Sequence, residues 1–415
     1  MTIQKENVFE ALTQQSWWQL SSIQIGGAIC LPVIMVGQAL AKNYGFISAV
    51  LAICIGNLLL LLLGLIAVHM TMQNKVTTIE NAQKYFGAQG TPILALTMVI
   101  CLGGWFAIQL NVMTLSFQEV CKIFFGNFSS GGLGNIIGNL ILGTLITGFA
   151  FKGMRSLNQL SNYSMPLLIG TIAYALLDHS PKPDIPKESF YTLGGVALVI
   201  ATAIAIIADM PTYYRFSKSN RDGMISILIL FIIALPIIEI VGVYIGVRNP
   251  DANIIDALTG GGGKLWHLWV GFFLVLAGWT TNNTNLYSAA ISLKAIMPSL
   301  SQPFRITLIG ILATLVSCFN ILEHFEIVLE GMTLSMSSMS AVIVIRYTLS
   351  NQHFNYLSNI LCWLLGTCAG LLSLFNLSLI TGMPILDSWI VSAIATFFLI
   401  RMEKINYYNK IICGK

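Results

Sequence analysis

The chain has 415 residues, of which 56% are hydrophobic and 9% are charged, with a formal net charge of +4. A soluble domain carries about 25% charged residues, so this composition excludes a soluble globular protein and predicts an all-α integral membrane protein. The small net charge is scattered along the chain and indicates no surface for binding nucleic acid.

Apolar runs of about 18 to 28 residues predict twelve transmembrane helices, since about 20 helical residues cross a bilayer. In chain order, we place them at residues 17–41, 46–70, 92–121, 133–151, 160–178, 191–212, 224–248, 267–293, 303–320, 326–348, 358–380 and 384–402. Residues 1–16 and 403–415 are then polar tails, and an even number of crossings puts both tails on one side of the membrane.

The distribution of lysine and arginine predicts which side the tails occupy. If both tails are inside, the inner segments hold 15 of the 21 basic residues and the outer loops hold six. Loops that stay in the cytoplasm are enriched in lysine and arginine. We therefore expect a multi-pass protein of the cell inner (plasma) membrane with both termini in the cytoplasm. We expect the protein to be embedded in the lipid bilayer, and the sequence indicates no obligatory protein partner.

The first predicted helix contains two features that interrupt a helix. Within the span 17–41, Gly26-Gly27 is followed by Pro32. Proline removes a backbone hydrogen bond and glycine weakens a helix, so we expect the middle of this helix to unwind and expose carbonyls. Discontinuous helices of this kind hold substrates and ions at the midplane of secondary transporters.

Six consecutive polar residues, Thr280 to Asn285, lie inside the predicted helix 267–293. The apolar run on each side is too short to cross a bilayer alone, so the cluster must lie near the membrane midplane. Unpaired polar groups at that depth are costly, and they persist where they line a cavity or hold an ion. The cluster therefore predicts a functional site. The alternative interpretation is hydrogen bonding between helices.

The threonines of this cluster indicate a cation site. The hydroxyls of Thr280 and Thr281, one turn after the Ala277 carbonyl, can present three oxygens to one point. Two carbonyls of the break at Gly26 can complete the shell. Oxygen ligands suit hard cations, and a shell without a fixed carboxylate favours a weakly held monovalent ion.

The predicted helix 92–121 carries a candidate platform for a planar ligand. It contains Gly103-Gly104-Trp105-Phe106, with Gln109 one turn further along. The glycines allow a neighbouring helix or a ligand to approach the backbone. Trp105 offers a flat aromatic face, and the Gln109 amide can hydrogen-bond the edge of a ring. The alternative is that Trp105 serves in helix packing or in the interfacial aromatic belt.

Two carboxylates lie at membrane depth. Glu239, within the span 224–248, is the better candidate for proton coupling. We expect Asp209 to pair with the Arg215 region or to cap a helix end. The sequence contains no nucleophile–base set, no phosphate-binding loop, no metal-ligand cluster and no soluble domain for ATP, so it predicts neither an enzyme nor a pump.

Several segments resemble the nucleobase–cation symporter family of cytosine, purine, uracil and allantoin permeases. The matches keep the family's order from about residue 20 to 290, and they are Ile55–Leu60, Thr77-Thr78 with Phe86-Gly87, Gly104–Phe106, Tyr214–Phe216 and Trp279-Thr-Thr-Asn-x-x-Asn-x-Tyr287-Ser288. The last of these motifs is the most specific. The final third of the chain matches only in helix count.

The resemblance implies a leucine-transporter-type fold. Ten helices would form a transport core at 17–348, as two inverted repeats at 17–178 and 191–348, followed by two additional transmembrane helices at 358–402. It also implies that a base stacks on Trp105. The sodium site that it implies consists of the Thr280 and Thr281 hydroxyls, the Ala277 carbonyl and carbonyls near Gly26 and Ile29.

The chain departs from the family pattern at two places. The family usually covers the second face of the base with an aromatic residue in the sixth helix, where this chain has Thr202-Ala203 and no glycine break. An asparagine of the eighth helix that reads the base in cytosine permeases falls at Ala277 here. These departures leave the fold expectation intact and bear on the substrate.

Together, these observations predict a secondary transporter that imports a nucleobase, cytosine or purine-like, or a similar planar heterocycle. Transport would proceed by cation symport and alternating access, with sodium favoured by Thr280-Thr281 and proton coupling kept open by Glu239. The candidate substrate residues are Gly104, Trp105, Gln109, Thr202, Ala203 and Ala277. One alternative is a same-fold transporter of an amino acid or of a vitamin precursor such as a hydroxymethylpyrimidine. A channel or a membrane sensor is the other.

Overall fold

The computed structural model describes residues 14–125, 132–151, 154–178, 193–248, 258, 263–319, 321, 325–349, 356–377 and 380–412. The described residues are largely helical, and their β-structure is limited to one bridge between Gln15 and Ser217. In chain order, the elements are α2 (Trp17–Ala28), α3 (Leu31–Tyr44), α4 (Phe46–Asn74), α5 (Thr78–Phe125), α6 (Gly132–Ala150), α7 (Met154–Asp178), α8 (Leu193–Tyr214), α9 (Asn220–Leu228), the π-helix η1 (Ile229–Ala234), α10 (Leu235–Arg248), α12 (Lys264–Leu293), α13 (Gln302–Ser317), α14 (Phe325–Leu349), α15 (Tyr356–Leu374) and α16 (Pro384–Ile412).

Each of the predicted membrane spans overlaps an observed helix or a run of consecutive helices. Among the described residues, eight helices are long and apolar enough to cross a membrane, or nine if the bent pair α2 and α3 forms one span. Helices α7, α12 and α13 are not among these, so the count of twelve stays a prediction. Residues 1–13 and 413–415 of the predicted tails lie outside the described residues, as does most of the predicted outer loops 179–190 and 249–266.

Helix α5 begins at Thr78, well before the predicted start of its span at residue 92. Gly87 has a φ of 66° inside it, so α5 consists of two helices joined at a kink. A residue with a side chain rarely adopts this left-handed conformation, which explains the glycine. The first part is capped by Glu80, whose carboxylate accepts a hydrogen bond of 2.7 Å from the Thr77 backbone N–H. The part after the kink carries the predicted span.

The break expected in the first predicted helix is present. Helices α2 and α3 meet at an angle of 62°. Ile29 ends α2 in an extended conformation, and Cys30 precedes the first turn of α3, which contains Pro32. Proline is tolerated in the first turn of a helix, where its missing N–H would have no partner. The sequence therefore begins a new helix here, and the last carbonyls of α2 are left for other partners.

The sixth predicted helix is not interrupted. Helix α8 runs continuously from Leu193 to Tyr214, and Pro211 lies close to its end. The absence of a glycine break at Thr202-Ala203 agrees with this continuity. The first predicted helix is therefore broken and the sixth is not. Helix α8 presents an unbroken row of side chains to the interior.

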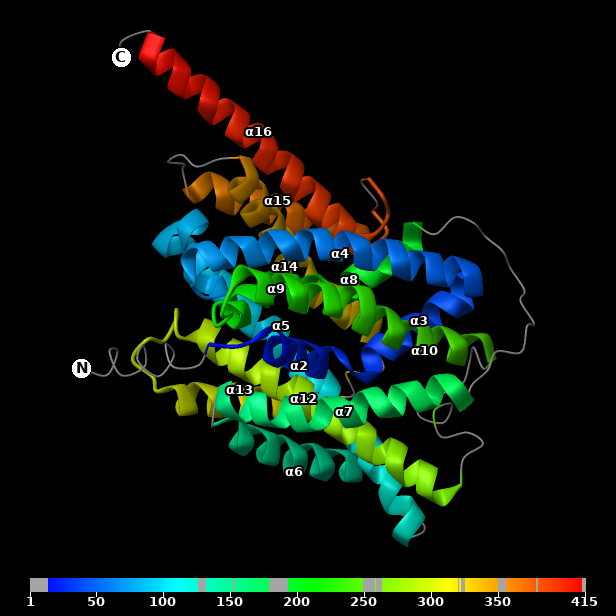
Figure 1. Ribbon diagram of the computed structural model, residues 1–415. Helices are drawn as coiled ribbons and strands as arrows, with labels where there is room; N and C mark the ends of the chain where they lie inside the picture. The colour runs from blue at the N-terminus through cyan, green and yellow to red at the C-terminus, as the bar shows by residue number, and fades with distance from the viewer. Residues whose placement is uncertain are drawn as a thin grey trace.

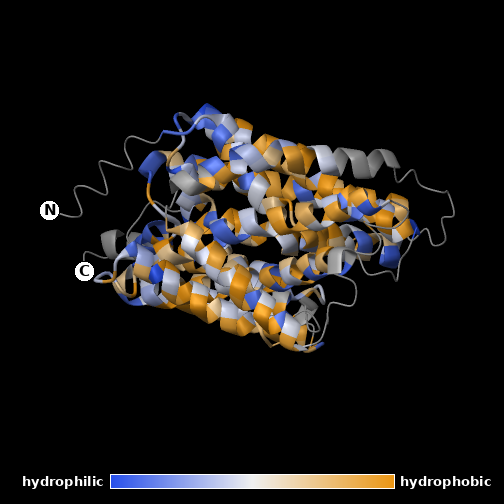
Figure 2. Cartoon of the chain, turned by 90° about the horizontal axis from the view of Figure 1, so that it is seen from below, coloured by the Kyte–Doolittle hydropathy of each residue, from blue (hydrophilic) through white to orange (hydrophobic). Residues whose placement is uncertain are grey.

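The helices form a single bundle, through which α12 runs obliquely among α2, α5, α6, α7 and α13 (Figure 1). Helix α12 packs chiefly on α5, while α3 packs on α10 and α4 packs on α8. Figure 2 shows hydrophobic residues along the length of the bundle and hydrophilic residues gathered toward its ends. Large apolar side chains such as Leu62, Ile100 and Leu312 are more than half exposed. Outward apolar faces of this kind suit a bilayer, where lipid covers them.

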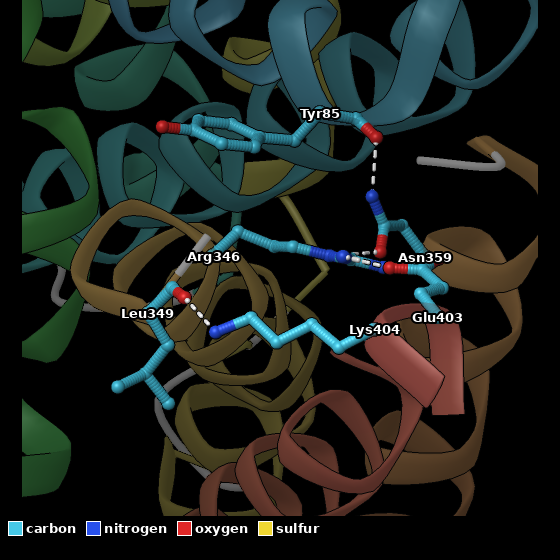
Figure 3. A network of polar contacts seen from close by, with 6 residues as sticks. All are labelled: Tyr85, Arg346, Leu349, Asn359, Glu403 and Lys404. Carbon is cyan, nitrogen blue, oxygen red and sulfur yellow. Dashed lines mark hydrogen bonds and ion pairs between the residues drawn. The ribbon is translucent and has the colours of Figure 1, made fainter. Parts of the chain in front are cut away.

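A buried ion-pair network holds the last two helices on the bundle (Figure 3). Arg346 of α14 is fully buried and donates to both carboxylate oxygens of Glu403 in α16, at 2.5 and 3.1 Å. Its Nε donates to Asn359 of α15 at 2.8 Å, and the Asn359 amide donates to the Tyr85 carbonyl in α5 at 2.6 Å. Two-pronged arginine–carboxylate pairs are strong and fix geometry. Arg346 therefore joins α14 to α15 and α16, and Asn359 joins α15 to α5.

Candidate functional site

The helix break and the polar cluster meet inside the bundle. The Thr280 hydroxyl lies 2.6 Å from the Gly26 carbonyl and 2.8 Å from the Ala277 carbonyl. The Thr281 hydroxyl lies 3.0 Å from the Gly27 carbonyl and 3.0 Å from the Ala277 carbonyl. Five oxygen atoms from α2 and α12 are therefore gathered in one place.

This oxygen cluster has the composition of a cation site. A hydroxyl carries one hydrogen, so each threonine can donate to only one of its two neighbouring carbonyls at a time. The other carbonyl beside each hydroxyl either shares that hydrogen or is available to a cation. Ile29, which the family resemblance implies as a ligand, stands at the break itself. Gly27, which the sequence assigns to the helix break but not to the ligand set, also contributes its carbonyl to the cluster.

A cavity of about 90 Å³ lies beside the oxygen cluster, between α2, α3, α5, α8 and α12. A single water needs roughly 10–15 Å³, so this space accommodates a larger molecule. Its lining includes Gln24, Trp105, Thr202, Asp209, Thr281 and Asn285. The cavity is apolar over most of its surface with a few polar groups, as is typical of sites for small ligands.

The predicted substrate residues divide into two groups. Trp105 and Thr202 line the cavity, whereas Gln109, Ala203 and Ala277 are buried without lining it. Gln109 lies one turn beyond Trp105, and its Nε2 has no hydrogen-bond partner among the described residues. Ala277 contributes its carbonyl to the oxygen cluster instead.

Gly104 faces a neighbouring helix. A Cβ atom added to Gly104 would overlap the sulfur of Met332 in α14. The glycine therefore allows α5 and α14 to approach closely, which is one of the two roles that the Gly-Gly pair predicted. The other role, close approach of a ligand, has no support from the cavity lining.

The prediction for Asp209 was wrong. Its carboxylate accepts hydrogen bonds from Ser288 at 2.6 Å and from Thr78 at 3.4 Å, and it makes none with Arg215. The Arg215 Nε donates to the Thr212 carbonyl at 3.3 Å instead. Arg215 follows the end of α8, and its side chain reaches the last turn of that helix and the Tyr287 hydroxyl of α12.

A periodic signal in the sequence could have placed Asp209 at the cavity. Thr202, Ile206, Asp209 and Tyr213 follow one another at intervals of four, three and four residues. In a helix, this spacing puts all four side chains on one face, and all four line the cavity. Because α8 is unbroken, the face continues from the site of Thr202 to the end of the helix.

Glu239 lies away from the cavity. It is buried in α10, and its Oε2 accepts a hydrogen bond of 2.6 Å from the Asn57 amide of α4. Its other oxygen, Oε1, has no hydrogen-bond partner among the described residues. A buried carboxylate with an unpartnered oxygen remains a candidate for proton coupling.

Comparison with known proteins identifies the family. The family model for permeases for cytosine/purines, uracil, thiamine and allantoin matches residues 7–353. The chain belongs to this family. The cytosine permease of Escherichia coli strain K12 is 21% identical over 346 residues, which cover 81% of this chain and 79% of that protein.

Solved structures of transporters share the fold of this permease. Mhp1, a nucleobase-cation-symport-1 family transporter in a closed conformation with bromovinylhydantoin bound, superimposes with a TM-score of 0.76 at 14% identity, covering 94% of this chain and 93% of Mhp1. A Na⁺-coupled sialic acid symporter gives a TM-score of 0.70 at 11% identity, covering 95% of this chain and 91% of that protein. At these identities, the likeness concerns the fold alone.

The family and the fold confirm the expected class of protein. The chain is an all-helical, multi-pass membrane permease, and its family transports nucleobase-like substrates. The family match ends at residue 353, so α15 and α16 lie beyond it. The division of the core into inverted repeats remains a prediction.

Proposed function

We propose that this permease imports a nucleobase, cytosine or purine-like, or a similar planar heterocycle by sodium symport. One observation carries the proposal. Gly27 and Thr281 belong to the oxygen cluster and also line the cavity. An ion and a substrate bound there would share a wall, so each would raise the affinity for the other by the same factor.

The coupling ion would bind among the Thr280 and Thr281 hydroxyls, the Ala277 carbonyl and the carbonyls of Gly26 and Ile29. Unwound carbonyls beside a helix break are the ligands that secondary transporters use for sodium. The Gly27 carbonyl, at 3.0 Å from the Thr281 hydroxyl, adds a further ligand. An ion held there joins α2 to α12 and stabilises one arrangement of the two helices.

The substrate would stack on Trp105. This side chain is buried at the cavity wall with 8% of its surface exposed. An aromatic face attracts a planar ring through dispersion and through its quadrupole. Thr202 contributes a small polar group from α8 to the same cavity.

Alternating access would require the seam between α8 and α12 to open. The Tyr213 hydroxyl donates to the Thr284 carbonyl at 2.7 Å, and both residues line the cavity. The bond between Ser288 and Asp209 lies in the same seam. With the basic loops in the cytoplasm, as the charge distribution predicts, this seam faces the cytoplasm and its opening would release the substrate inward.

Uptake into proteoliposomes tests the proposal. Vesicles with the full-length protein receive labelled cytosine, adenine, guanine and uracil under an inward sodium gradient at fixed pH. We expect saturable accumulation of at least one base that collapses when the gradient is removed. Uptake of all four bases equal to that of empty vesicles would contradict the nucleobase proposal, and passive equilibration would indicate a channel.

The variant Glu239→Gln separates sodium from proton coupling. The amide oxygen of glutamine can still accept the hydrogen bond from Asn57, but the side chain cannot carry a proton. We expect sodium-driven uptake to persist in this variant. Wild-type uptake that follows a pH gradient rather than the sodium gradient, and that is lost in Glu239→Gln, would instead assign the coupling to a proton at Glu239.

A second candidate substrate class is favoured by the α8 wall. Around Thr202, helix α8 lines the cavity with small side chains such as Ala205 and with no aromatic ring. A vitamin precursor such as a hydroxymethylpyrimidine, or an amino acid, would place its substituents there. A thermal-shift screen with nucleobases, aminopyrimidines and amino acids distinguishes these classes by the ligand that raises the melting temperature.

A further inference from the structure

We propose that Asp209 and the hydroxyl groups around it form a second site for a monovalent cation, so that transport couples two positive charges to each base. The inference rests on the proposed function, because the charges are counted against base uptake. The first cation is the ion of the oxygen cluster at Thr280 and Thr281. The second is a sodium ion or a proton, both of which bind to oxygen ligands, and the experiments below distinguish the two.

Asp209 brings a carboxylate to the cavity without a basic partner. It is the only carboxylate among the described residues that line the cavity, and none of those residues is a lysine, arginine or histidine. Its side chain is buried, and no described basic residue forms an ion pair with it. A buried ionised carboxylate is costly unless an opposite charge lies beside it. A cation bound at Asp209 supplies that charge.

Three hydroxyl groups from three helices surround this carboxylate. Its Oδ1 accepts hydrogen bonds from Ser288 of α12 at 2.6 Å and from Thr78 of α5 at 3.4 Å. Thr212 of α8 is a third hydrogen-bond partner, and its hydroxyl lies 3.1 Å from that of Thr78. A hydroxyl can turn its hydrogen away and present a lone pair. The four groups then offer an all-oxygen shell, which suits a hard cation.

This site is separate from the oxygen cluster at Thr280 and Thr281. Ser288 follows Thr281 by seven residues on α12, which is about 10 Å along the helix axis. An ion in the oxygen cluster joins α12 to α2, whereas a cation at Asp209 joins α12 to α8 and α5. Each cation therefore holds a different pair of walls together around the base. By reciprocity, the base raises the affinity for both cations.

Asp209 and Thr78 lie between two cavities. Asp209 lines the main cavity, and Thr78 lines a smaller one of about 20 Å³ between α4, α5, α8 and α14. The smaller cavity has room for a water molecule, which needs roughly 10–15 Å³. On α8, Ile206 faces the main cavity and Ile207 faces the smaller one. A cation at Asp209 therefore has space for a water ligand on the side away from the base.

The groups that face Asp209 supply no positive charge of their own. The Cys101 thiol of α5 and the Tyr213 phenol of α8 are close enough to interact with its charge. Thiols and phenols are ordinarily neutral at pH 7 and negative when they ionise. From α12 the facing group is the Ser288 hydroxyl, and α14 adds Ser340 and apolar side chains at the smaller cavity. A bound cation is therefore what these described surroundings lack.

The charge moved with each base tests the proposal on the wild-type protein in proteoliposomes. Sodium and pH are equal on both sides, and a potassium gradient with valinomycin sets the membrane potential. The accumulation of labelled cytosine, adenine, guanine and uracil is read at zero net flux and neutral pH, where all four bases are uncharged. At about 59 mV, inside negative, we expect about 100-fold accumulation, since each charge contributes about tenfold. About tenfold accumulation or less overturns the proposal and leaves the proposed function standing. No uptake of any of the four bases overturns both.

Two chemical gradients identify the second cation. Each ion that moves with the base multiplies the accumulation ratio by its own gradient when the membrane potential is held at zero. Accumulation that follows the square of the sodium gradient supports the proposal with sodium at Asp209. Accumulation that follows the sodium gradient and the proton gradient, each to the first power, supports it with a proton at Asp209.

Carboxylate variants assign the second charge to Asp209. Asp209→Asn keeps the size of the side chain and removes its charge, so we expect accumulation at the same potential to fall about tenfold. Glu119→Gln is the matched control, because Glu119 lies at the surface of α5 and pairs with Lys122. An unchanged ratio in Asp209→Asn overturns the proposal. The same fall in Glu239→Gln, in place of Asp209→Asn, assigns the charge to α10 and also overturns it.

Hydroxyl variants test the same site if Asp209→Asn does not fold. Ser288→Ala and Thr78→Ala each remove one oxygen of the shell and keep the carboxylate. We expect each to raise the concentration of the second cation for half-maximal uptake about tenfold, with two charges still moved per base. Thr307→Ala is the control, because Thr307 is exposed and bonds only to its own helix. An unchanged cation dependence in both variants overturns the proposal.

Discussion

The Thr281 hydroxyl lies 3.0 Å from the Gly27 carbonyl, and the same two residues form part of the cavity wall. This contact joins the broken first helix to the polar cluster of α12, and it makes one structural unit of two sites that the sequence places 254 residues apart. In the proposed function, a ligand in the cavity and an ion in the oxygen cluster share this wall. The shared wall is the basis of the coupling that we propose.

Removal of the Thr281 hydroxyl is expected to uncouple transport from sodium. The variant Thr281→Ala lacks one oxygen of the cluster, so the sodium concentration for half-maximal uptake should rise about tenfold, which corresponds to about 1.4 kcal/mol. Base uptake as a function of sodium concentration measures this shift. Thr307→Ala is the control, because Thr307 is exposed on α13 and bonds only to its own helix. An unchanged sodium dependence in Thr281→Ala contradicts the assigned ion site.

Loss of the Trp105 ring is expected to weaken base binding. Stacking of a base on an aromatic side chain contributes roughly 1–3 kcal/mol, so Trp105→Ala should raise the dissociation constant by about five- to 150-fold, and Trp105→Phe should raise it less. Titration calorimetry with the preferred base provides the measurement. Trp269→Ala removes a tryptophan that does not line the cavity. Equal losses in the two alanine variants would point to general destabilisation.

Gly242 permits the close approach of α3 and α10. A Cβ atom at this position would overlap the backbone carbonyl of Ile34, which cannot rotate away as a side chain can. We therefore expect Gly242→Ala to force the helices apart and to lower the melting temperature in detergent, with an overpacking penalty of about 1–3 kcal/mol. Gly148→Ala is the matched control, because nothing lies within 4 Å of the added atom. A neutral Gly242→Ala would show that α3 and α10 separate easily.

Arg346 is expected to determine how firmly α15 and α16 are attached. Its removal takes away the hydrogen bonds that the guanidinium donates to the Glu403 carboxylate and to the Asn359 side-chain oxygen (Figure 3). Removing one partner of a buried ion pair lowers the free energy of unfolding by about 3–5 kcal/mol. Because Glu403 is partly exposed, we expect the loss in Arg346→Met to lie near the lower end of this range. Thermal unfolding followed by tryptophan fluorescence measures the effect. Lys404→Ala, an exposed neighbour, should change stability by about 0.5 kcal/mol or less.

The sequence by itself determined the class of protein, the approximate helix bounds and the presence of a break in the first predicted helix, which the structure places at Ile29 and Cys30. These properties depend on local chemistry. An apolar run of sufficient length must be helical in a bilayer because no water satisfies its backbone. Proline has no N–H for the carbonyl four residues before it, so Pro32 favours a break just ahead of it. The midplane depth of Thr280 to Asn285 stays a prediction of the same length argument.

The tertiary structure decided which side chains meet. Gly104 and Trp105 are neighbours in sequence, yet one packs on Met332 of α14 and the other lines the cavity. Asp209 bonds with Ser288 across 79 residues rather than with nearby Arg215. Composition and spacing define the faces of a helix, but the rotation of each helix about its axis depends on how all its neighbours pack. Contacts between α8 and α12 therefore become visible only when the whole bundle is assembled.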